Sequence, residues 1–379
     1  MNRYFIYQFA AFGDCLFATI VVKQLKYNDP DCEITWGISK RYVSILKNNP
    51  YVDRILEFEI DPKTATPNEF DKHNSVINNL EKEFGSNFIH LQLLNKHIHH
   101  LFTTLRYTVI KVFGGPITVS RNAVLYLDQK EKDNVKEFIF KNEINTYSTK
   151  ILFECAPSSG QSTVDYKFAL QVAEKIIAKN KNVCIVLSGA FSIEVNSPQI
   201  FNANSISYRE NLELINYCDL LIGCSSGISW LTICESAKPI PMIQLLSSKS
   251  DLFAGVHFDF EINNLDNSHI LEMINFDVIK TVECIEAFLK VGILETKLKF
   301  HQEYKPSIFN LKNNVMKLVW QKFPILELRN YIERYLEENR FLKNEIQLNF
   351  IDKWLIILKS QFNRYLYKSK QIIINYAKK

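Results

Sequence analysis

The sequence contains no apolar run long enough to cross a bilayer, and it begins with a strand-like segment, Met1 to Tyr7, instead of a signal peptide. None of its eight cysteines forms a CxxC pair, so we expect reduced core thiols in a cytoplasmic protein. The GxSxG, HExxH, Walker A and EF-hand patterns are missing too. These absences exclude several common enzyme and binding classes.

A broad basic face, which a nucleic-acid-binding body needs, is also missing. The net charge is +4, but seven cations and no acid follow Asp352. The remaining 38 basic and 41 acidic side chains give residues 1–352 a charge of −3. We therefore expect no nucleic-acid partner.

The histidines offer no convincing metal site. Only His97, His99 and His100 cluster, and their spacing does not place three ring nitrogens on one face beside a carboxylate. We expect neither a metal nor a cofactor.

Strand-like and helix-like segments alternate along the first three quarters of the chain, as in parallel βαβ units. The alternation pauses in a polar stretch and then restarts, so we predict two successive α/β domains in a chain of 379 residues. The predicted ranges are 1–128 for the first domain, 129–150 for a linker, 151–300 for the second domain and 301–379 for a helical extension.

Individual elements follow from the same pattern. Predicted strands lie at 3–9, 31–38, 50–56, 87–91, 123–127, 151–155, 183–187, 219–222 and 238–243. Predicted helices extend to about residue 27 after the first strand and lie near 40–48, 68–83, 98–113, 164–178, 211–217 and 228–236.

Two features of the extension suggest partners. Leu328, Ile332, Tyr335, Asn339, Leu342 and Ile346 follow a heptad spacing. This spacing predicts either a homodimeric coiled coil over 328–346 or a helix that packs on its own domain. Beyond Asp352, aromatic and aliphatic residues alternate with the seven cations, which suits an anionic membrane surface or a solvated helix against the body.

The stretch from Leu220 to Leu231 combines a strand end, a tight turn and a helix start. The turn consists of small residues, Gly223, Cys224, Ser225, Ser226 and Gly227. Backbone N–H groups and the positive end of a helix dipole converge there, which favours a phosphate. An ordinary turn in which serine caps the helix has the same pattern.

Two further loops follow predicted strands of the second domain. One contains Ser158, Ser159, Gly160, Gln161 and Ser162 and has no Lys or Arg; the other contains Ser188 and Gly189. Because ligands of open α/β sheets bind at the carboxyl ends of parallel strands, we expect these loops to face one crevice with the 223–227 turn. Glu154 precedes the first loop and contacts either an acceptor or only the loop backbone.

Gly13 and Asp14 lie at the first strand-to-helix turn. Gly13 permits close approach of the backbone. Asp14 is either a helix cap, which contributes roughly 1 kcal/mol, or a general base.

Residues 5–56 resemble the opening of the heptosyltransferase-like glycosyltransferases of family nine. That family shares a Gly-Asp-x-Leu turn, an amphipathic helix, a Pro-Asp-x-Glu-Ile-Thr strand and an Asn-Pro-Tyr-Val-Asp segment, and all four occur here in order. Residues 186–189 and 211–231 resemble its strand ending in a glycine pair and its nucleotide-sugar segment. The resemblance covers roughly residues 1–245. It implies a GT-B fold, which is two Rossmann-like domains with parallel sheets and the active site between them.

The resemblance also implies roles for individual residues. Asp14 would be the general base, Gly13 would lie near the donor phosphates, and Ser226, Gly227 and Ser229 would bind the diphosphate. The chain departs from the family pattern at Ser225, where an Asp is usual, and at Trp230, where a His is usual. The basic residue expected in the 156–163 loop is missing as well.

We therefore expect an inverting, metal-independent glycosyltransferase at the inner face of the cytoplasmic membrane. Its partners would be a nucleotide-sugar donor and a glycan or lipid-linked glycan acceptor of lipopolysaccharide, capsule or a related polymer. The alternative is a non-catalytic module of the same fold that binds a glycan or a partner protein at the membrane.

Overall fold

A computed structural model describes residues 1–92, 104–155, 157, 160–189, 195, 197–248, 255–320, 324–339 and 356–361. The chain divides into two compact units. The first comprises Met1–Gln92, Val109–Ser250 and Ala254–Tyr304, and it contains both β-sheets. The second comprises Leu93–Thr108, Asp251–Phe253 and Lys305–Lys379.

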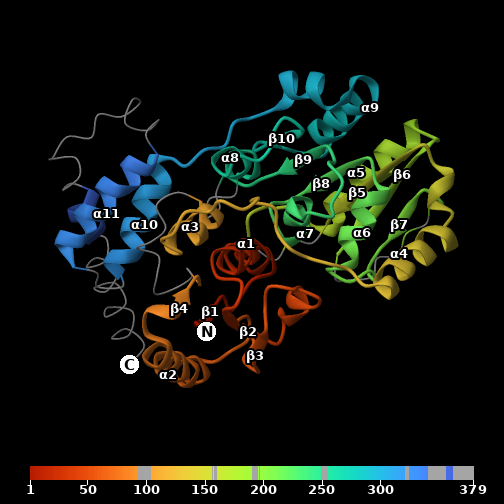
Figure 1. Cartoon of the computed structure of the whole chain (residues 1–379). Helices are drawn as coiled ribbons and strands as arrows, with labels where there is room; N and C mark the ends of the chain where they lie inside the picture. The colour runs from red at the N-terminus through yellow and green to blue at the C-terminus, as the bar shows by residue number, and fades with distance from the viewer. Residues whose placement is uncertain are drawn as a thin grey trace, which may run out of the picture. The chain divides into compact units, whose positions relative to one another are not determined.

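The first sheet, with its helices, is called the first lobe below. Its strands are all parallel in the order β3-β2-β1-β4. Its elements are β1 (Arg3–Tyr7), α1 (Phe12–Asn28), β2 (Glu33–Ser39), the 3-10 turn η1 (Val43–Leu46), β3 (Arg54–Phe58), α2 (Pro67–Phe84), η2 (Gly85–Asn87) and β4 (Phe88–His90). In Figure 1, α1 and α2 cover opposite sides of this sheet.

The second sheet, in the second lobe, has six parallel strands in the order β10-β9-β8-β5-β6-β7. The strands are β5 (Thr149–Glu154), β6 (Val183–Ser188), β7 (Ile200–Asn202), β8 (Leu220–Gly223), β9 (Met242–Leu245) and β10 (Ile270–Met273). Strand order reverses between β5 and β8, as in doubly wound dinucleotide-binding sheets, where ligands bind outside the carboxyl ends at this switch point.

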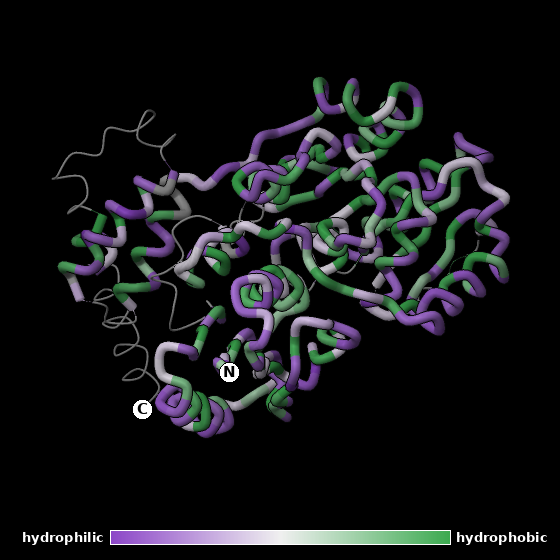
Figure 2. Tube along the Cα trace, in the orientation of Figure 1, coloured by the Kyte–Doolittle hydropathy of each residue, from purple (hydrophilic) through white to green (hydrophobic). Residues whose placement is uncertain are grey.

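Helices flank the second sheet. They are α4 (Gln129–Lys141), η4 (Ile144–Thr146), α5 (Tyr166–Lys179), α6 (Glu210–Tyr217), α7 (Gly227–Trp230), η5 (Leu231–Ile233), α8 (Val256–Ile262) and α9 (Val278–Phe300). Helices α5 and α9 pack together, as do α4 and α6. Figure 2 shows hydrophobic strands in this sheet and a hydrophilic outer helix, α4. Fully buried side chains of β5, β6 and β8 belong to the core of the lobe: Ile151, Phe153, Ile185, Leu187, Leu220 and Ile222.

The second unit includes the first half of α3 (Leu105–Val112), whose second half belongs to the first unit. It also includes α10 (Ile308–Trp320), α11 (Ile325–Glu338) and a short helix over 356–361. Helices α10 and α11 pack together: Asn314 Nδ2 donates to Tyr331 Oη at 2.9 Å, and Tyr335 Oη donates to the Ser307 carbonyl at 3.2 Å.

The heptad-like residues in α11 are therefore covered within one chain. Leu328, Ile332 and Tyr335 are buried, and α11 ends at Glu338 with Asn339 as its C-cap. The predicted helix does not continue through Asn339, and residues 340–346 lie outside the described part. The cationic tail also lies outside it, apart from 356–361.

The predicted strands 50–56 and 238–243 begin four residues too early, because β3 is Arg54–Phe58 and β9 is Met242–Leu245. Three other predicted elements are wrong in kind or length. Residues 123–127 form no strand but a single bridge between Ala123 and Cys234, because the Val124 N–H donates to Thr19 Oγ1 instead of to a neighbouring strand. The helix expected at 40–48 is only the 3-10 turn η1. The helix expected at 228–236 is divided into α7 and η5.

Candidate functional site

The turn after β1 is fixed by a glutamine from the end of β4. Gln92 Oε1 accepts hydrogen bonds at 2.9 Å from the backbone N–H groups of Phe9 and Ala10 and from the side chain of Gln8. The chain then enters α1, where the Cys15 N–H donates to the Ala11 carbonyl. Asp14 therefore stands in the first turn of a well-anchored helix and is only 7% exposed.

The turn after β8 is held from beneath by two buried side chains. The Cys224 N–H donates to Glu154 Oε2 and the Ser225 N–H to Gln244 Oε1, both at 2.9 Å. Ser225 has a positive φ of 51°, which non-glycine residues seldom adopt, so these bonds stabilise an unfavourable backbone conformation. Ser226 follows as the half-buried N-cap residue of α7.

Ser229 joins the same buried network. Its hydroxyl lies 3.2 Å from both Glu154 Oε2 and Gln244 Oε1, and the side chain is fully buried. A Cβ on Gly223 would collide with the Gln244 amide and the Ser229 hydroxyl, so the network requires glycine there. Ser229 braces the turn from inside, whereas Ser226 and Gly227 lie nearer its surface.

Glu154 is the carboxylate at the centre of this network. Burial raises its pKa to about 7, although the hydrogen bonds from Cys224 and Ser229 oppose the shift. The sequence left open whether Glu154 contacts an acceptor or only the loop. At 2% exposed, its carboxylate instead accepts from the backbone of the turn after β8, at the Cys224 N–H.

The loop after β5 adjoins the same turn. Ser158 and Ser159 lie outside the described residues, and Gly160 is exposed at a positive φ of 69°. Gln161 is buried, and its carbonyl accepts from the Ser247 N–H at 2.9 Å. The Ser162 side chain forms a hydrogen bond with Cys224, which joins this loop to the turn after β8.

Among the described residues of these loops, two buried polar atoms form no hydrogen bond. They are Gln161 Oε1 and Ser225 Oγ. A buried polar atom that lacks a partner costs about 1–3 kcal/mol. Such atoms beside a strand-order switch point are typical of a binding site whose ligand supplies the missing bonds.

The loop after β6 is held internally. Ser188 Oγ donates to Asn211 Oδ1 at 2.8 Å, and the Ser188 carbonyl accepts from the Cys155 N–H at 3.0 Å. A Cβ on Gly189 would collide with the Tyr166 hydroxyl. Ser188 and Gly189 lie at the carboxyl edge of the sheet, as the sequence predicted. Ser188 bonds to Asn211 and Cys155 and Gly189 packs against Tyr166, and all three partners belong to the second lobe.

The turns of the two lobes are in contact. A Cβ on Gly13 would lie 3.1 Å from Cδ1 of Trp230, a side chain that is 1% exposed. Phe12 stacks on Tyr208 with ring centroids 4.2 Å apart, and Tyr208 Oη donates to the Gly227 carbonyl at 3.1 Å. The start of α1, with Asp14, therefore faces the start of α7.

The sequence did not single out Tyr208, Arg209, Gln244 or Gln92. Two signals were present. First, Ser207 and Glu210 fit the S-x-x-E pattern of a helix start, and their side chains do bond reciprocally to each other's backbone. The second signal is the position of Arg209 directly before this helix. A cation is disfavoured there by the positive end of the helix dipole, so an acidic partner from another element could be expected.

Among the described residues, no three His, Cys, Asp or Glu side chains are grouped to hold a metal ion. His97, His99 and His100 lie outside that part of the chain. No helix in the described ranges is both long and apolar enough to cross a membrane.

Two doubly wound parallel sheets whose carboxyl edges meet define the GT-B class of folds. More particularly, the chain has the fold of a glycosyl transferase family 9 structure from Veillonella parvula. The TM-score is 0.51 at 14% identity, over 84% of this chain and 97% of that one. The resemblance found in the sequence is thus confirmed at the level of the fold.

Two Escherichia coli structures are also similar. The ADP-heptose lipopolysaccharide heptosyltransferase II aligns at 14% identity and a TM-score of 0.49, over 76% of this chain and 99% of that one. A heptosyltransferase solved with ADP aligns at 10% identity and a TM-score of 0.48, over the same shares. No protein-family model matches the sequence, and the search of curated proteins gives no match.

Proposed function

We propose that the protein is a glycosyltransferase that moves a sugar from a nucleotide-sugar donor to a cell-surface glycan acceptor. The observation that carries the proposal is the contact between the start of α1, with Asp14, and the turn after β8. The helix start that carries Asp14 in one lobe thereby packs against a backbone turn in the other lobe that is suited to an anion.

In this reaction the donor diphosphate lies against the second lobe. Gly13, Ser226, Gly227 and the 158–162 loop supply N–H and hydroxyl donors, and Ser229, Ser188 and Gly189 shape the loops that carry them. Ser225 Oγ and Gln161 Oε1 are the buried atoms available for hydroxyl groups of the donor. Neutral donors replace the cations that many diphosphate sites use.

Asp14 acts as the general base. Its carboxylate takes the proton of the acceptor hydroxyl while that oxygen attacks the anomeric carbon from the side opposite the nucleotide. The bond from the anomeric carbon to the diphosphate oxygen breaks, and the nucleoside diphosphate leaves with the electron pair. The sugar is inverted, and the site's N–H donors stabilise the leaving charge without a metal ion.

The acceptor belongs to lipopolysaccharide, capsule or a related polymer. The Escherichia coli protein of similar fold is described as an ADP-heptose lipopolysaccharide heptosyltransferase. The cationic tail would bring the protein to the inner face of the cytoplasmic membrane, where lipid-linked acceptors are made.

A thermal-shift screen with UDP-, GDP-, ADP- and CMP-sugars tests donor binding, because a ligand of the native state raises the apparent stability. Asp14→Asn should then reduce transfer about 10²- to 10⁴-fold, the usual contribution of a general base, with donor binding retained. The matched control is Asp277→Asn, since Asp277 caps α9 and asparagine caps equally well. Unchanged turnover in Asp14→Asn would exclude this mechanism.

Trp230 favours a second candidate function. Its indole fills the space beside Gly13 where the family has a histidine, and the loops carry no cation. A binding module of the same fold, without catalysis, is consistent with both features. Isothermal titration calorimetry separates the two candidates. Binding of a nucleotide sugar supports the transferase, and no measurable binding of any of the UDP-, GDP-, ADP- and CMP-sugars supports the binding module.

A further inference from the structure

Arg209 forms the most densely bonded polar contact between the lobes that the described residues contain. It lies directly before α6 and is 3% exposed. Its Nε and Nη2 donate to the two carboxylate oxygens of Glu131 at 2.6 and 3.0 Å. Planar, bidentate pairing of this kind fixes orientation as well as distance.

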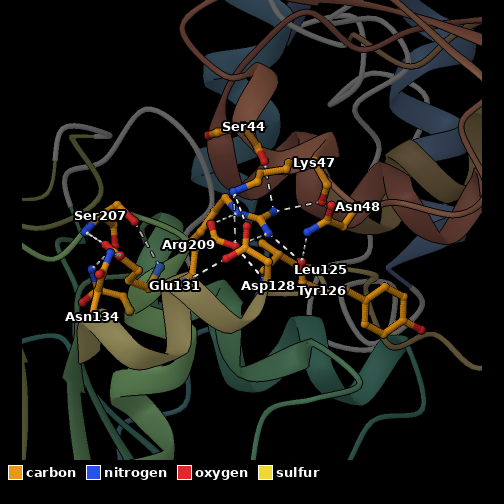
Figure 3. Close-up of polar contacts among 12 residues, drawn as sticks. Ser44, Lys47, Asn48, Leu125, Tyr126, Asp128, Glu131, Asn134, Ser207 and Arg209 are labelled. Carbon is orange, nitrogen blue, oxygen red and sulfur yellow. Dashed lines mark hydrogen bonds and ion pairs between the residues drawn. The ribbon is translucent and has the colours of Figure 1, made fainter. Parts of the chain in front are cut away.

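The remaining donors of Arg209 reach backbone carbonyls. Nη2 also donates to Tyr126 at 2.6 Å, and Nη1 donates to Ser44 at 3.0 Å and to Lys47 at 3.2 Å (Figure 3). These bonds use all five N–H groups of the guanidinium. Ser44 and Lys47 belong to the first lobe, Glu131 to the second, and Tyr126 to the segment that joins them, so one side chain connects all three.

Lys47 strengthens the same junction. Its ammonium lies 2.7 Å from Asp128 and 3.6 Å from Glu131. Burial opposes ionisation of Glu131, but hydrogen bonds from Arg209 and from the Asp128 backbone bring its pKa below the usual value. The carboxylate is therefore charged at neutral pH and keeps both bonds to Arg209.

Tyr208 connects this junction to the site. Its ring stacks on Phe12, two residues before Asp14, and its hydroxyl donates to the Gly227 carbonyl. A Cβ on Gly227 would lie 2.9 Å from Cε2 of the same ring. The ring therefore lies directly against the turn after β8, residues 223–227, which is called the donor turn below. Tyr208 thus contacts the turns after β1 and β8, and the adjacent Arg209 bonds the two lobes to each other.

We propose that Tyr208 and Arg209 form a positioning element that sets the separation between Asp14 and the donor turn. Arg209 fixes the orientation of the first lobe through the Ser44 and Lys47 carbonyls. Tyr208 transmits that orientation to the turns on either side of the site. The inference rests on the proposed transferase function for its kinetic consequence, but the positioning itself is a property of the fold.

A distance measurement tests the positioning. All eight cysteines are buried, so cysteines introduced at the exposed positions Glu57 and Lys175, one in each lobe, accept spin labels selectively. With Arg209 intact, pulsed electron paramagnetic resonance should give one narrow distribution of distances between the labels at positions 57 and 175. Arg209→Met, which keeps the length of the side chain and removes its donors, should broaden or shift it, and Arg209→Lys should give an intermediate result.

The control is Arg54→Met. Arg54 pairs with Glu33 at 2.7 Å within the first lobe and is largely exposed, so this change should leave the distribution as it was. A narrow, unshifted distribution in Arg209→Met, with a native circular-dichroism spectrum, overturns the proposal. If the Met variant does not fold, Arg209→Lys carries the same test.

Kinetics supply the second readout. A displacement of about 1 Å can reduce turnover by about 10²-fold, so Arg209→Met should lower kcat by that order with KM for the donor changed little. Tyr208→Phe, which keeps the stacking and loses the bond to Gly227, should lower kcat less. A raised KM with unchanged kcat overturns the positioning role. If the wild-type protein transfers no sugar, the proposed function fails, and the distance measurement still decides the positioning.

Discussion

Glu154 gives the protein a measurable dependence of stability on pH. Its carboxyl is fully buried at the end of β5, and its folded pKa is about 7 against an ordinary value of 4.5. Between these values the folded state keeps a proton that the unfolded state releases. The contribution of Glu154 to stability is therefore fully present below pH 4.5 and is lost as the pH rises to about 7. The difference of 2.5 pKa units corresponds to about 3 kcal/mol.

Glu154→Gln removes this titration while preserving the size of the side chain. Its amide oxygen still accepts from the Cys224 N–H. Between pH 5 and pH 8, the free energy of unfolding of the variant should rise by about 2.5 kcal/mol relative to that of the wild type. Urea unfolding followed by circular dichroism gives this difference at each pH. Contributions from other titrating groups cancel because they are common to both proteins.

Glu174→Gln is the matched control, because Glu174 is exposed on α5 in the same lobe. Its stability should follow that of the wild type over the whole range. If the curves of Glu154→Gln and the wild type also stay parallel from pH 5 to pH 8, the carboxyl titrates normally, and the argument from its burial fails.

Three further changes test other parts of the structure. Gly223→Ala places a methyl group against Gln244 and Ser229 and should destabilise the protein by about 1–3 kcal/mol, seen as a lower midpoint of thermal unfolding; an unchanged midpoint contradicts the packing described for this turn. Burial raises the pKa of Glu272 to about 8, so its contribution to wild-type stability is lost as the pH rises from 4.5 to 8. Glu272→Gln should remove this loss and flatten the dependence of unfolding free energy on pH. If the variant and the wild type lose stability in parallel over this range, the pKa of Glu272 is not raised. Cutting after Asp352 removes seven cations and should release the protein from anionic liposomes in a flotation assay, and retention would refute anchoring by this segment.

The sequence predicts the parts of the fold that depend on local pattern. The succession of β1, α1 and β2 follows from an apolar strand, a Gly-Asp turn and a long buried helix, and Asp14 stands where that pattern puts it. The turn after β8 was recognisable from its run of small residues, Gly223 to Gly227. These features depend on residues within a few positions of each other.

The contacts between lobes were not predictable in this way. Arg209 bonds to the carbonyl of Ser44, 165 positions away, and every residue offers a carbonyl, so no pattern marks the partner. Ser229 was expected at the diphosphate because the family resemblance gives that position this role. Its burial depends on Glu154 and Gln244, which come from two other strands. The short strands β7 and β10 are three and four residues long and give little periodicity.

The position of Trp230 gives the protein an optical reporter of its own. The indole is enclosed by Gly13 and Phe17 from one lobe and Phe260 from the other, away from water. Any parting of the lobes would hydrate it and shift its fluorescence to longer wavelength. Replacing Trp36, Trp320 and Trp354 with phenylalanine would leave this emission alone, so that opening and closing could be timed by stopped flow in unlabelled protein.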